Sequence, residues 1–190
     1  KTLDLSGWVT LTNQSGAAYP NATLQLVAGD VNRVQSRRPA APMMAMARMD
    51  KAAAAPEMKE ESLFEYHLYT LDRPTTLKEN QTKQVALLTA SSVPVRKEYL
   101  LRGDSYYYQG SYGDLGDKLK VGVFVEFDNK TESRMGMPLP KGIVRVYKRD
   151  SEGRPQFVGE DSIDHTPKNE LVRLKLGDAF DVTARRKQTD

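Results

Sequence analysis

Apolar and polar residues alternate along segment after segment of this chain, most regularly between residues 119 and 127. In that segment every second residue is apolar without interruption: Leu119, Val121, Val123, Val125 and Phe127. A period of two places side chains on one face of a β-strand, whereas a helix needs a period of about 3.6. The chain is therefore predicted to be an all-β protein.

A hairpin is the strongest local prediction. The segments GIVRVYKR and PQFVGEDSI both alternate, and they flank the short run from Asp150 to Gly153. Glycine can adopt the positive φ that such tight connections require. We therefore expect residues 142–149 and 155–163 to form two antiparallel strands joined by a turn.

Other alternating segments are predicted to supply the remaining strands. The opening segment TLDLSGWVTLTN is expected to form a hairpin with a strand over Ala22–Val31. The others are LFEYHLYTL, in which Phe64, Tyr66 and Leu68 share a face, KQVALLTA, VPVRKEYLL, LVRLKL and AFDVTARR. About ten short strands with turns between them favour an antiparallel β-sandwich, Ig-like or related, with a barrel as the second choice.

The composition changes sharply over residues 36–62, which are rich in Met and Ala. A short helix between Pro42 and Pro56 is one interpretation, but a disordered insertion that joins two strands is favoured. The total length of 190 residues suits one core, so we expect a single β domain over residues 1–190 that carries this insertion. Because the chain begins at Lys1 inside an apparent strand, we expect it to be a fragment of a larger protein.

Charge and composition argue against several classes of partner. The 28 basic and 25 acidic residues are interspersed and leave a net charge of +3, which describes a mixed surface rather than a groove for phosphates. Nucleic acid is therefore not an expected partner. The chain has no Cys, which excludes disulfides and thiolate metal sites. No apolar run approaches the roughly 18 residues of a membrane span.

Carboxylates and an imidazole crowd together at Glu160, Asp161, Asp164 and His165, so any metal or acid–base hypothesis starts there. Strand alternation places Asp161 and His165 on one face beside two apolar residues. A carboxylate in such a place usually belongs to a satisfied hydrogen-bond network. We favour that structural role, with His67 able to reach His165 only through folding, and predict no catalytic residue, metal or cofactor.

Tyrosines gather in the segment RGDSYYYQGSYGDLGDK, at Tyr106, Tyr107, Tyr108 and Tyr112. Exposed tyrosines can stack on sugars or anchor a protein partner. The alternative, that every second one belongs to the core, has equal weight. Four asparagines are followed two positions later by Ser or Thr, a pattern typical of turns here: Asn13, Asn21, Asn80 and Asn129.

Several long phrases of the chain resemble one family. They are LDLSGWVTLTNQSGAAYPNATLQLVAGDVNRV, LYTLDRPTTLKENQTKQVALLTA, PLPKGIVRVYKRDSEGRPQFVGEDSIDHTPKNE and LGDAFDVTARR. In this order they resemble the bacterial family of unknown function that forms the C-terminal part of mucoidy-inhibitor-like proteins. The resemblance implies a bacterial source, a larger parent with an N-terminal domain and a coiled-coil region, and export to the cell envelope. It implies no reaction and no catalytic residues.

Three functions are carried forward. The first is a non-enzymatic interaction module of a bacterial envelope or secreted protein, whose partner is another protein or other domains of its parent. The second is a polysaccharide-binding module that uses the Tyr106–Tyr112 segment. The third is a metal-dependent hydrolase at Asp161, Asp164 and His165.

Overall fold

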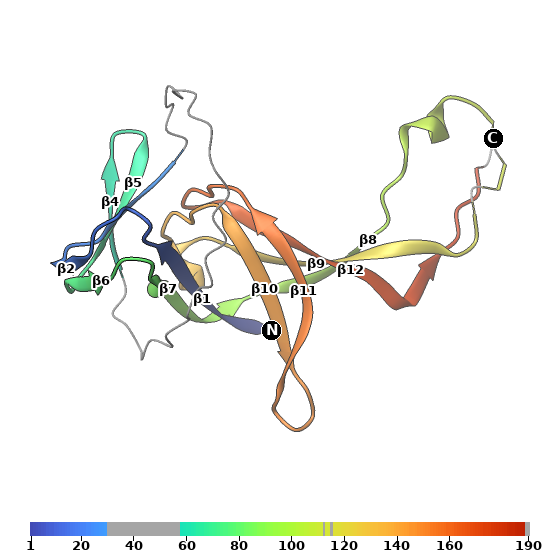
Figure 1. Cartoon of the computed structure of the whole chain (residues 1–190). Helices are drawn as coiled ribbons and strands as arrows, with labels where there is room; N and C mark the ends of the chain where they lie inside the picture. The colour runs from blue at the N-terminus through green and yellow to red at the C-terminus, as the bar shows by residue number, and fades with distance from the viewer. Residues whose placement is uncertain (30–57, 112, 115, 189–190) are drawn as a thin grey trace. The chain divides into compact units, whose positions relative to one another are not determined.

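The computed structural model describes residues 1–29, 58–111, 113–114 and 116–188. These residues form twelve β-strands and two short 3-10 helices, and they contain no α-helix. The strands lie in five small antiparallel sheets, none of which closes on itself (Figure 1). The all-β prediction is confirmed. No helix in the described part of the chain is both long and apolar enough to cross a membrane.

The chain divides into two compact units, although its length alone favoured one core. The N-terminal unit comprises residues 3–93, and the C-terminal unit comprises residues 1–2 and 94–190. Each unit has its own buried apolar side chains, such as Tyr69 and Val85 in the first and Phe127 and Leu174 in the second. The two units are therefore described one at a time.

The N-terminal unit holds three sheets. Its strands are β1 (Thr2–Thr12), β2 (Tyr19–Ala22), β3 (Gln25–Ala28), β4 (Met58–Leu63), β5 (Tyr66–Leu71), β6 (Thr75–Leu77) and β7 (Thr82–Pro94). β1 pairs with β7, β2 with β6, and β5 lies between β3 and β4. The hairpin predicted between the first two strands is therefore wrong. The second predicted strand, residues 22–31, shares only Ala22 with β2 and contains the whole of β3, while residues 30 and 31 lie outside the described structure. Asn21 in β2 has a positive φ of 48°.

The insertion predicted over residues 36–62 overlaps the described structure only at its end. Residues 30–57 lie outside the described part of the chain. The residues from Met58 onward belong to β4, where Met58 is buried and pairs with Leu71 of β5. Phe64 follows β4 at a φ of 57° and is 87% exposed, so it occupies the turn before β5 and does not share a buried face with Tyr66 and Leu68.

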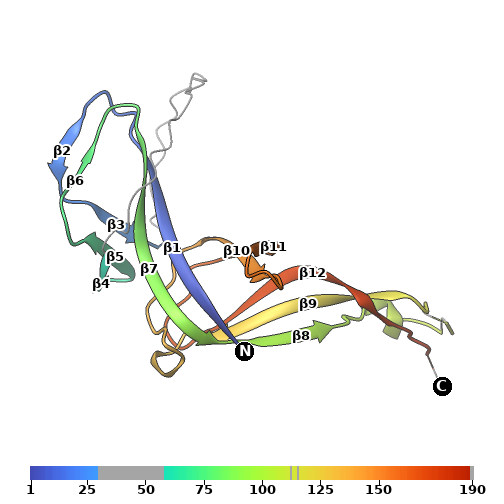
Figure 2. The same ribbon diagram turned by 90° about the horizontal axis from the view of Figure 1, so that it is seen from below.

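The C-terminal unit is built on a three-stranded sheet with β9 (Leu119–Asp128) between β8 (Arg96–Leu100) and β12 (Leu171–Ala184) (Figure 2). The strand predicted over residues 119–127 is confirmed as β9, and Val121 and Phe127 are buried on its predicted apolar face. Burial does not alternate strictly, because Phe124 is also buried and lies on the opposite face. β12 is one strand where the sequence predicted two. Its pairing with β9 is irregular between Asp178 and Thr183, which explains the apparent break in the pattern.

The predicted hairpin is confirmed with the predicted bounds: β10 (Gly142–Arg149) pairs with β11 (Pro155–Ile163). The register shifts between Val146 and Tyr147, which lie opposite Gly159 and Phe157, respectively. A Cβ atom on Gly159 would be only 2.5 Å from the carbonyl oxygen of Leu176 in β12. One face of the hairpin therefore packs closely on β12, because this glycine has no side chain.

Candidate binding surface

Asp161 joins the hairpin to the neighbouring sheet. Its Oδ2 atom accepts a hydrogen bond of 2.7 Å from the backbone N–H of Lys175 in β12, and its Oδ1 atom accepts one from the backbone N–H of Ser162. The sequence suggested His165 as the partner of Asp161. The carboxylate is bonded to backbone amides instead, and it holds β11 against β12.

The other members of the predicted polar cluster bond to residues that are not partners of Asp161. Glu160 accepts a hydrogen bond of 3.0 Å from Arg145 across the hairpin. Asp164 pairs with the ammonium of Lys141 at 3.1 Å, and the exposed His165 accepts a bond at Nδ1 from the backbone N–H of Lys141. A neutral imidazole that accepts at Nδ1 carries its proton on Nε2. The four side chains therefore do not meet at one point.

The histidines also have different surroundings. His67 lies in the N-terminal unit, where its Nδ1 atom is 2.8 Å from Oε1 of Glu60. His165 belongs to the C-terminal unit. Across the described ranges, no group of three or more His, Asp or Glu side chains is arranged to hold a metal ion.

The tyrosine segment forms the 3-10 helix η1 (Ser105–Tyr108). Tyr107 is buried, and the guanidinium of Arg186 lies 4.2 Å from its ring centroid. Tyr106 is 44% exposed and packs edge-on against Tyr107, with ring centroids 4.5 Å apart. The side chain of Tyr108 and the whole of Tyr112 lie outside the described structure.

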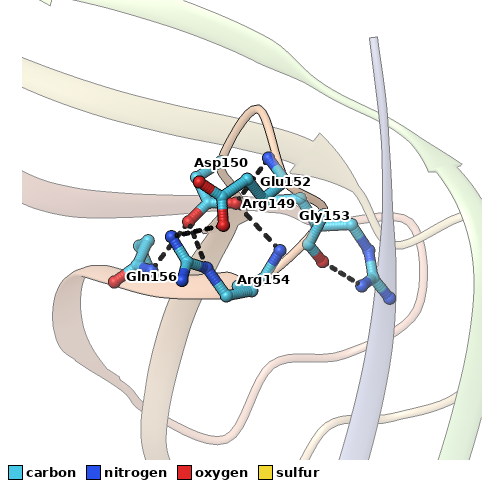
Figure 3. Close-up of polar contacts among 6 residues, drawn as sticks. All are labelled: Arg149, Asp150, Glu152, Gly153, Arg154 and Gln156. Carbon is cyan, nitrogen blue, oxygen red and sulfur yellow. Dashed lines mark hydrogen bonds and ion pairs between the residues drawn. The ribbon is translucent and has the colours of Figure 1, made fainter.

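The turn of the hairpin is organised by Asp150 (Figure 3). Its Oδ1 atom accepts bonds of 2.9 Å from the backbone N–H groups of Glu152 and Arg154. Its Oδ2 atom accepts from the side chains of Arg154 and Gln156. The hydrogen bond from the Arg154 backbone, followed by that from Gln156, lowers the pKa of the Asp150 carboxyl. Gly153 completes the turn at a φ of 80°.

Large apolar side chains lie on the face of the hairpin that points away from β12. Ile143, Tyr147 and Phe157 are 66%, 57% and 56% exposed, respectively. Tyr147 and Phe157 are register partners, and their rings meet edge-on with centroids 5.7 Å apart. Together with Arg145 and Glu160, these residues define what we call the hairpin outer face. Figure 1 shows that the hairpin extends as a long two-stranded ribbon.

The sequence contained a signal for this face that its interpretation missed. Alternation puts Ile143, Arg145 and Tyr147 on the same side of β10, and the turn sets Phe157 opposite Tyr147. Alternation alone cannot distinguish an apolar face that is buried in a core from one that is open to solvent. The burial of each face is therefore known only from the structure.

Comparison of the chain with protein-family models, with curated proteins and with solved structures found no match. The fold and the surface define a protein of the all-β class that carries an exposed aromatic hairpin. Its function is therefore inferred from the chemistry of that surface.

Proposed function

We propose that this chain is a non-enzymatic protein-interaction module and that the hairpin outer face is its contact surface. The observation that carries the proposal is the exposure of three large apolar side chains, Ile143, Tyr147 and Phe157, on one face of an ordered hairpin. Exposed apolar clusters with a polar rim are typical of protein-binding surfaces, and tyrosine is enriched among the residues that dominate binding energy.

The surface is ordered before it binds. Asp150 holds the turn through backbone and side-chain hydrogen bonds, and Asp161 ties β11 to β12. A contact surface that is already ordered loses little conformational entropy on binding. Full burial of each large apolar side chain would contribute roughly 1.5–3 kcal/mol before such losses.

The charges of the surface suggest the chemistry of the partner. The charge of Arg145 is matched by Glu160 within the same face. Arg149 follows Tyr147 by two residues on β10 and so lies on the same side of the strand. It donates a hydrogen bond to the carbonyl of Gly153, and no described carboxylate pairs with its guanidinium. We therefore expect a protein partner with an apolar centre and a carboxylate that faces Arg149.

The same packing supports a finer description of the fold. The close approach of Gly159 to Leu176 and the bond from Lys175 to Asp161 lay the hairpin on the β12 sheet. Two antiparallel layers in face-to-face contact are the basis of a β-sandwich. A sandwich arrangement of the C-terminal unit is therefore part of this proposal.

A photo-crosslinking amino acid at position 147 tests the interaction in cells of the source organism. We expect a covalent adduct of one defined mass, whose protein component mass spectrometry identifies, and we expect Ile143→Asp to abolish it. The matched control places the crosslinker at position 180, because Phe180 is also exposed but lies on β12. No adduct at position 147, or the same adducts at both positions, would contradict the proposal.

A polysaccharide is the alternative partner, and the half-exposed ring of Tyr106 is the observation that favours it. An exposed tyrosine ring offers a flat surface on which a sugar can stack. A glycan array of envelope polysaccharides distinguishes the two partners. Binding that Tyr106→Ala removes and Tyr147→Ala preserves would favour the polysaccharide, whereas a silent array would exclude it.

The hydrolase alternative gains no support from the geometry. Asp161 bonds to the backbone N–H of Lys175, whereas Asp164 and His165 bond to the ammonium and to the backbone N–H of Lys141, respectively. Zinc titration is its direct test, because an ion that binds the native protein raises the melting temperature by mass action. A shift that Asp161→Asn abolishes would revive this alternative.

A further inference from the structure

Two asparagines are the buried polar residues of the described chain. Asn13 is 5% exposed and Asn129 is 0% exposed. Each comes directly after a long strand, since β1 ends at Thr12 and β9 ends at Asp128. A buried amide is costly unless its donors and acceptor are satisfied, so the partners of these two side chains are informative.

Asn13 is bonded to the turn that precedes β7. Its backbone N–H donates to the carbonyl of Gln81, and its carbonyl accepts from the N–H of Asn80. Its side-chain Nδ2 atom donates to the carbonyls of Lys78, at 3.1 Å, and Ala17, at 2.7 Å. Its Oδ1 atom accepts from Ser15 in its own loop. Asn13 thus links its own loop to the turn at residues 78–81, which is distant in sequence.

Asn129 repeats this arrangement before β12. Its backbone N–H donates to the carbonyl of Glu170, and its carbonyl accepts from the N–H of Asn169. Its Nδ2 atom donates to the carbonyls of Pro167, at 2.9 Å, and Met137, at 2.7 Å. Its Oδ1 atom accepts from the N–H of Gly136 in its own loop.

The two sets of partners have identical internal spacing. Residues 78, 80 and 81 surround the first asparagine, and residues 167, 169 and 170 surround the second. The middle residue is an asparagine with a left-handed backbone in both turns, at a φ of 56° for Asn80 and 68° for Asn169. Left-handed residues other than glycine are uncommon, so this agreement adds weight to the match.

The strand order and register repeat as well. In each unit a long strand ends at the buried asparagine, and a second long strand, β7 or β12, returns antiparallel beside it. Thr12 is hydrogen-bonded to Thr82, and the equivalent Asp128 pairs with Leu171. Between the long strands, Tyr19 pairs with Leu77 in one unit, and Leu139 pairs with Thr166 in the other.

The amino-acid sequence follows the same correspondence. Residues 3–13 read LDLSGWVTLTN and residues 119–129 read LKVGVFVEFDN. The two segments share their first leucine, an aromatic residue followed by valine, and the final asparagine. Proline also follows Tyr19 and Leu139 at the start of the next paired segment.

From this combination we infer that the chain contains two copies of one structural module. In each copy an equivalent buried asparagine, Asn13 or Asn129, bonds the end of the first long strand to the turn before the second. Each copy has a pair of strands between its two long strands, β3 and β5 in the first copy and β10 and β11 in the second. The copies differ most in the connection within this pair. A tight turn joins β10 to β11, whereas residues 29–65, which include β4, lie in the sequence between β3 and β5. Hairpin tips are where a module most readily accepts added residues. The inference does not depend on the proposed interaction surface.

Interchangeable turns are what a shared module predicts. The test exchanges KENQ of residues 78–81 with PKNE of residues 167–170 in the full chain. Both left-handed asparagines and all carbonyl partners remain. The exchange removes two exposed contacts of the first turn, from the backbone N–H of Gly16 to the carboxylate of Glu79 and from the backbone N–H of Lys78 to Oε1 of Gln81. Proline at position 78 has no N–H to replace the second. Proline at position 78 is compatible with an extended Leu77 before it.

Hydrogen exchange measured along the full chain provides the readout. We expect the exchanged protein to keep the protection of both units within about threefold. A matched control of unchanged composition swaps Glu79 and Asn80, which puts glutamate at the left-handed position. In this control the protection of amides around β7 should fall at least about tenfold. Loss in the exchanged protein equal to that of this control would overturn the inference.

An isosteric change at each asparagine provides a second readout that does not need the exchange. Asn13→Asp places a carboxylate against the carbonyls of Lys78 and Ala17. We expect at least about tenfold faster exchange in the N-terminal unit and little change in the other. Asn129→Asp should give the mirror result. Equal loss across both units in either variant would contradict two separately closed modules.

Discussion

The guanidinium of Arg173 in β12 lies over the ring of Phe124 in β9, 4.6 Å from its centroid. The same side chain pairs with Glu126 on β9 and with Glu98 on β8. Arg173 thus covers an aromatic ring and links all three strands of the C-terminal sheet. An Arg that combines stacking with charge-assisted bonds is not replaceable by a simple positive charge.

Replacing Arg173 with Ala should lower the free energy of unfolding by about 2–3 kcal/mol, because the stacking on Phe124 is lost together with the ion pairs to Glu98 and to the part-buried Glu126. Arg96→Ala is the matched control, because Arg96 pairs with the same Glu126 from an exposed position. Its loss should stay below about 1 kcal/mol. Urea denaturation followed by circular dichroism measures both. Equal losses would show that the stacking over Phe124 contributes nothing.

Gly159→Ala should be among the most destabilising single changes in the hairpin. The residue has a φ of 150°, and an added Cβ would be 2.5 Å from the carbonyl oxygen of Leu176. We expect a loss of about 2–4 kcal/mol from strain and from separation of β11 and β12. Gly153→Ala is the control, since its φ is 80° but nothing lies within 4 Å of the added atom. Its cost should be about 1 kcal/mol.

Asp150 should make the hairpin turn sensitive to acid. Its pKa is lowered in the folded chain, chiefly by the backbone N–H of Arg154 and then by Gln156. A lowered pKa stabilises the fold above the unfolded value of about 3.9, and that contribution disappears as the pH falls through the folded value. The protection of the amides of residues 152 and 154 against hydrogen exchange, relative to an unstructured chain at the same pH, should therefore fall below about pH 4. Asp150→Asn should remove this dependence on pH, and Glu152→Gln should preserve it.

Tyr69 should make the N-terminal unit sensitive to alkali. Burial, and then the charge of Glu60, raises the pKa of its phenol well above the ordinary range. The neutral phenol stabilises the fold fully below the unfolded pKa of about 10, and this contribution declines as the pH rises above that value. Ultraviolet titration should find one tyrosine that ionises only when the unit unfolds. Tyr69→Phe should remove that late step, while Tyr19→Phe, which changes an exposed ring, should not.

Equivalent positions of the two inferred modules should respond differently to truncation. Trp8 is 62% exposed, whereas the corresponding Phe124 is 8% exposed. Trp8→Ala should change the free energy of unfolding by less than about 0.5 kcal/mol. Phe124→Ala should cost about 3 kcal/mol or more, because it opens a cavity under Arg173. Urea denaturation measures both. As the only Trp of the chain, Trp8 should also be readily quenched by acrylamide.

The features predicted well from the sequence are local. The hairpin over residues 142–163 was predicted with its bounds because alternation and turn chemistry lie within a short segment. The pairing of β1 with β7 was not, because alternation shows that a strand has an apolar face but does not name its partner. The predicted hairpin at the N-terminus was wrong for this reason.

The candidate site was harder to predict than the fold, because its polar side chains bond mainly to backbone groups. Nearly every residue has the same backbone N–H and carbonyl, so the sequence does not show which of them a side chain will meet. Asp161 was recognised as a polar residue with a structural role, but its partner is the backbone N–H of Lys175. Asn13 and Asn129 were recognised only as turn residues. Their burial follows from carbonyls that converge after folding. The similarity of residues 3–13 to residues 119–129 is a signal in the sequence for the repeated module, and the sequence interpretation did not use it.

The buried asparagines also decide which acceptor triplets a glycosylating enzyme could use. Asn13 and Asn129 each head an Asn-x-Ser/Thr triplet, yet their amide nitrogens are already donating to two carbonyls inside the fold. An N-linked sugar needs that same nitrogen. Of the four triplets, only those at Asn21 and Asn80 have an exposed asparagine in the folded chain. A glycan on Asn13 or Asn129 would therefore have to be attached before folding. It would then prevent the hydrogen bonds of that asparagine from forming.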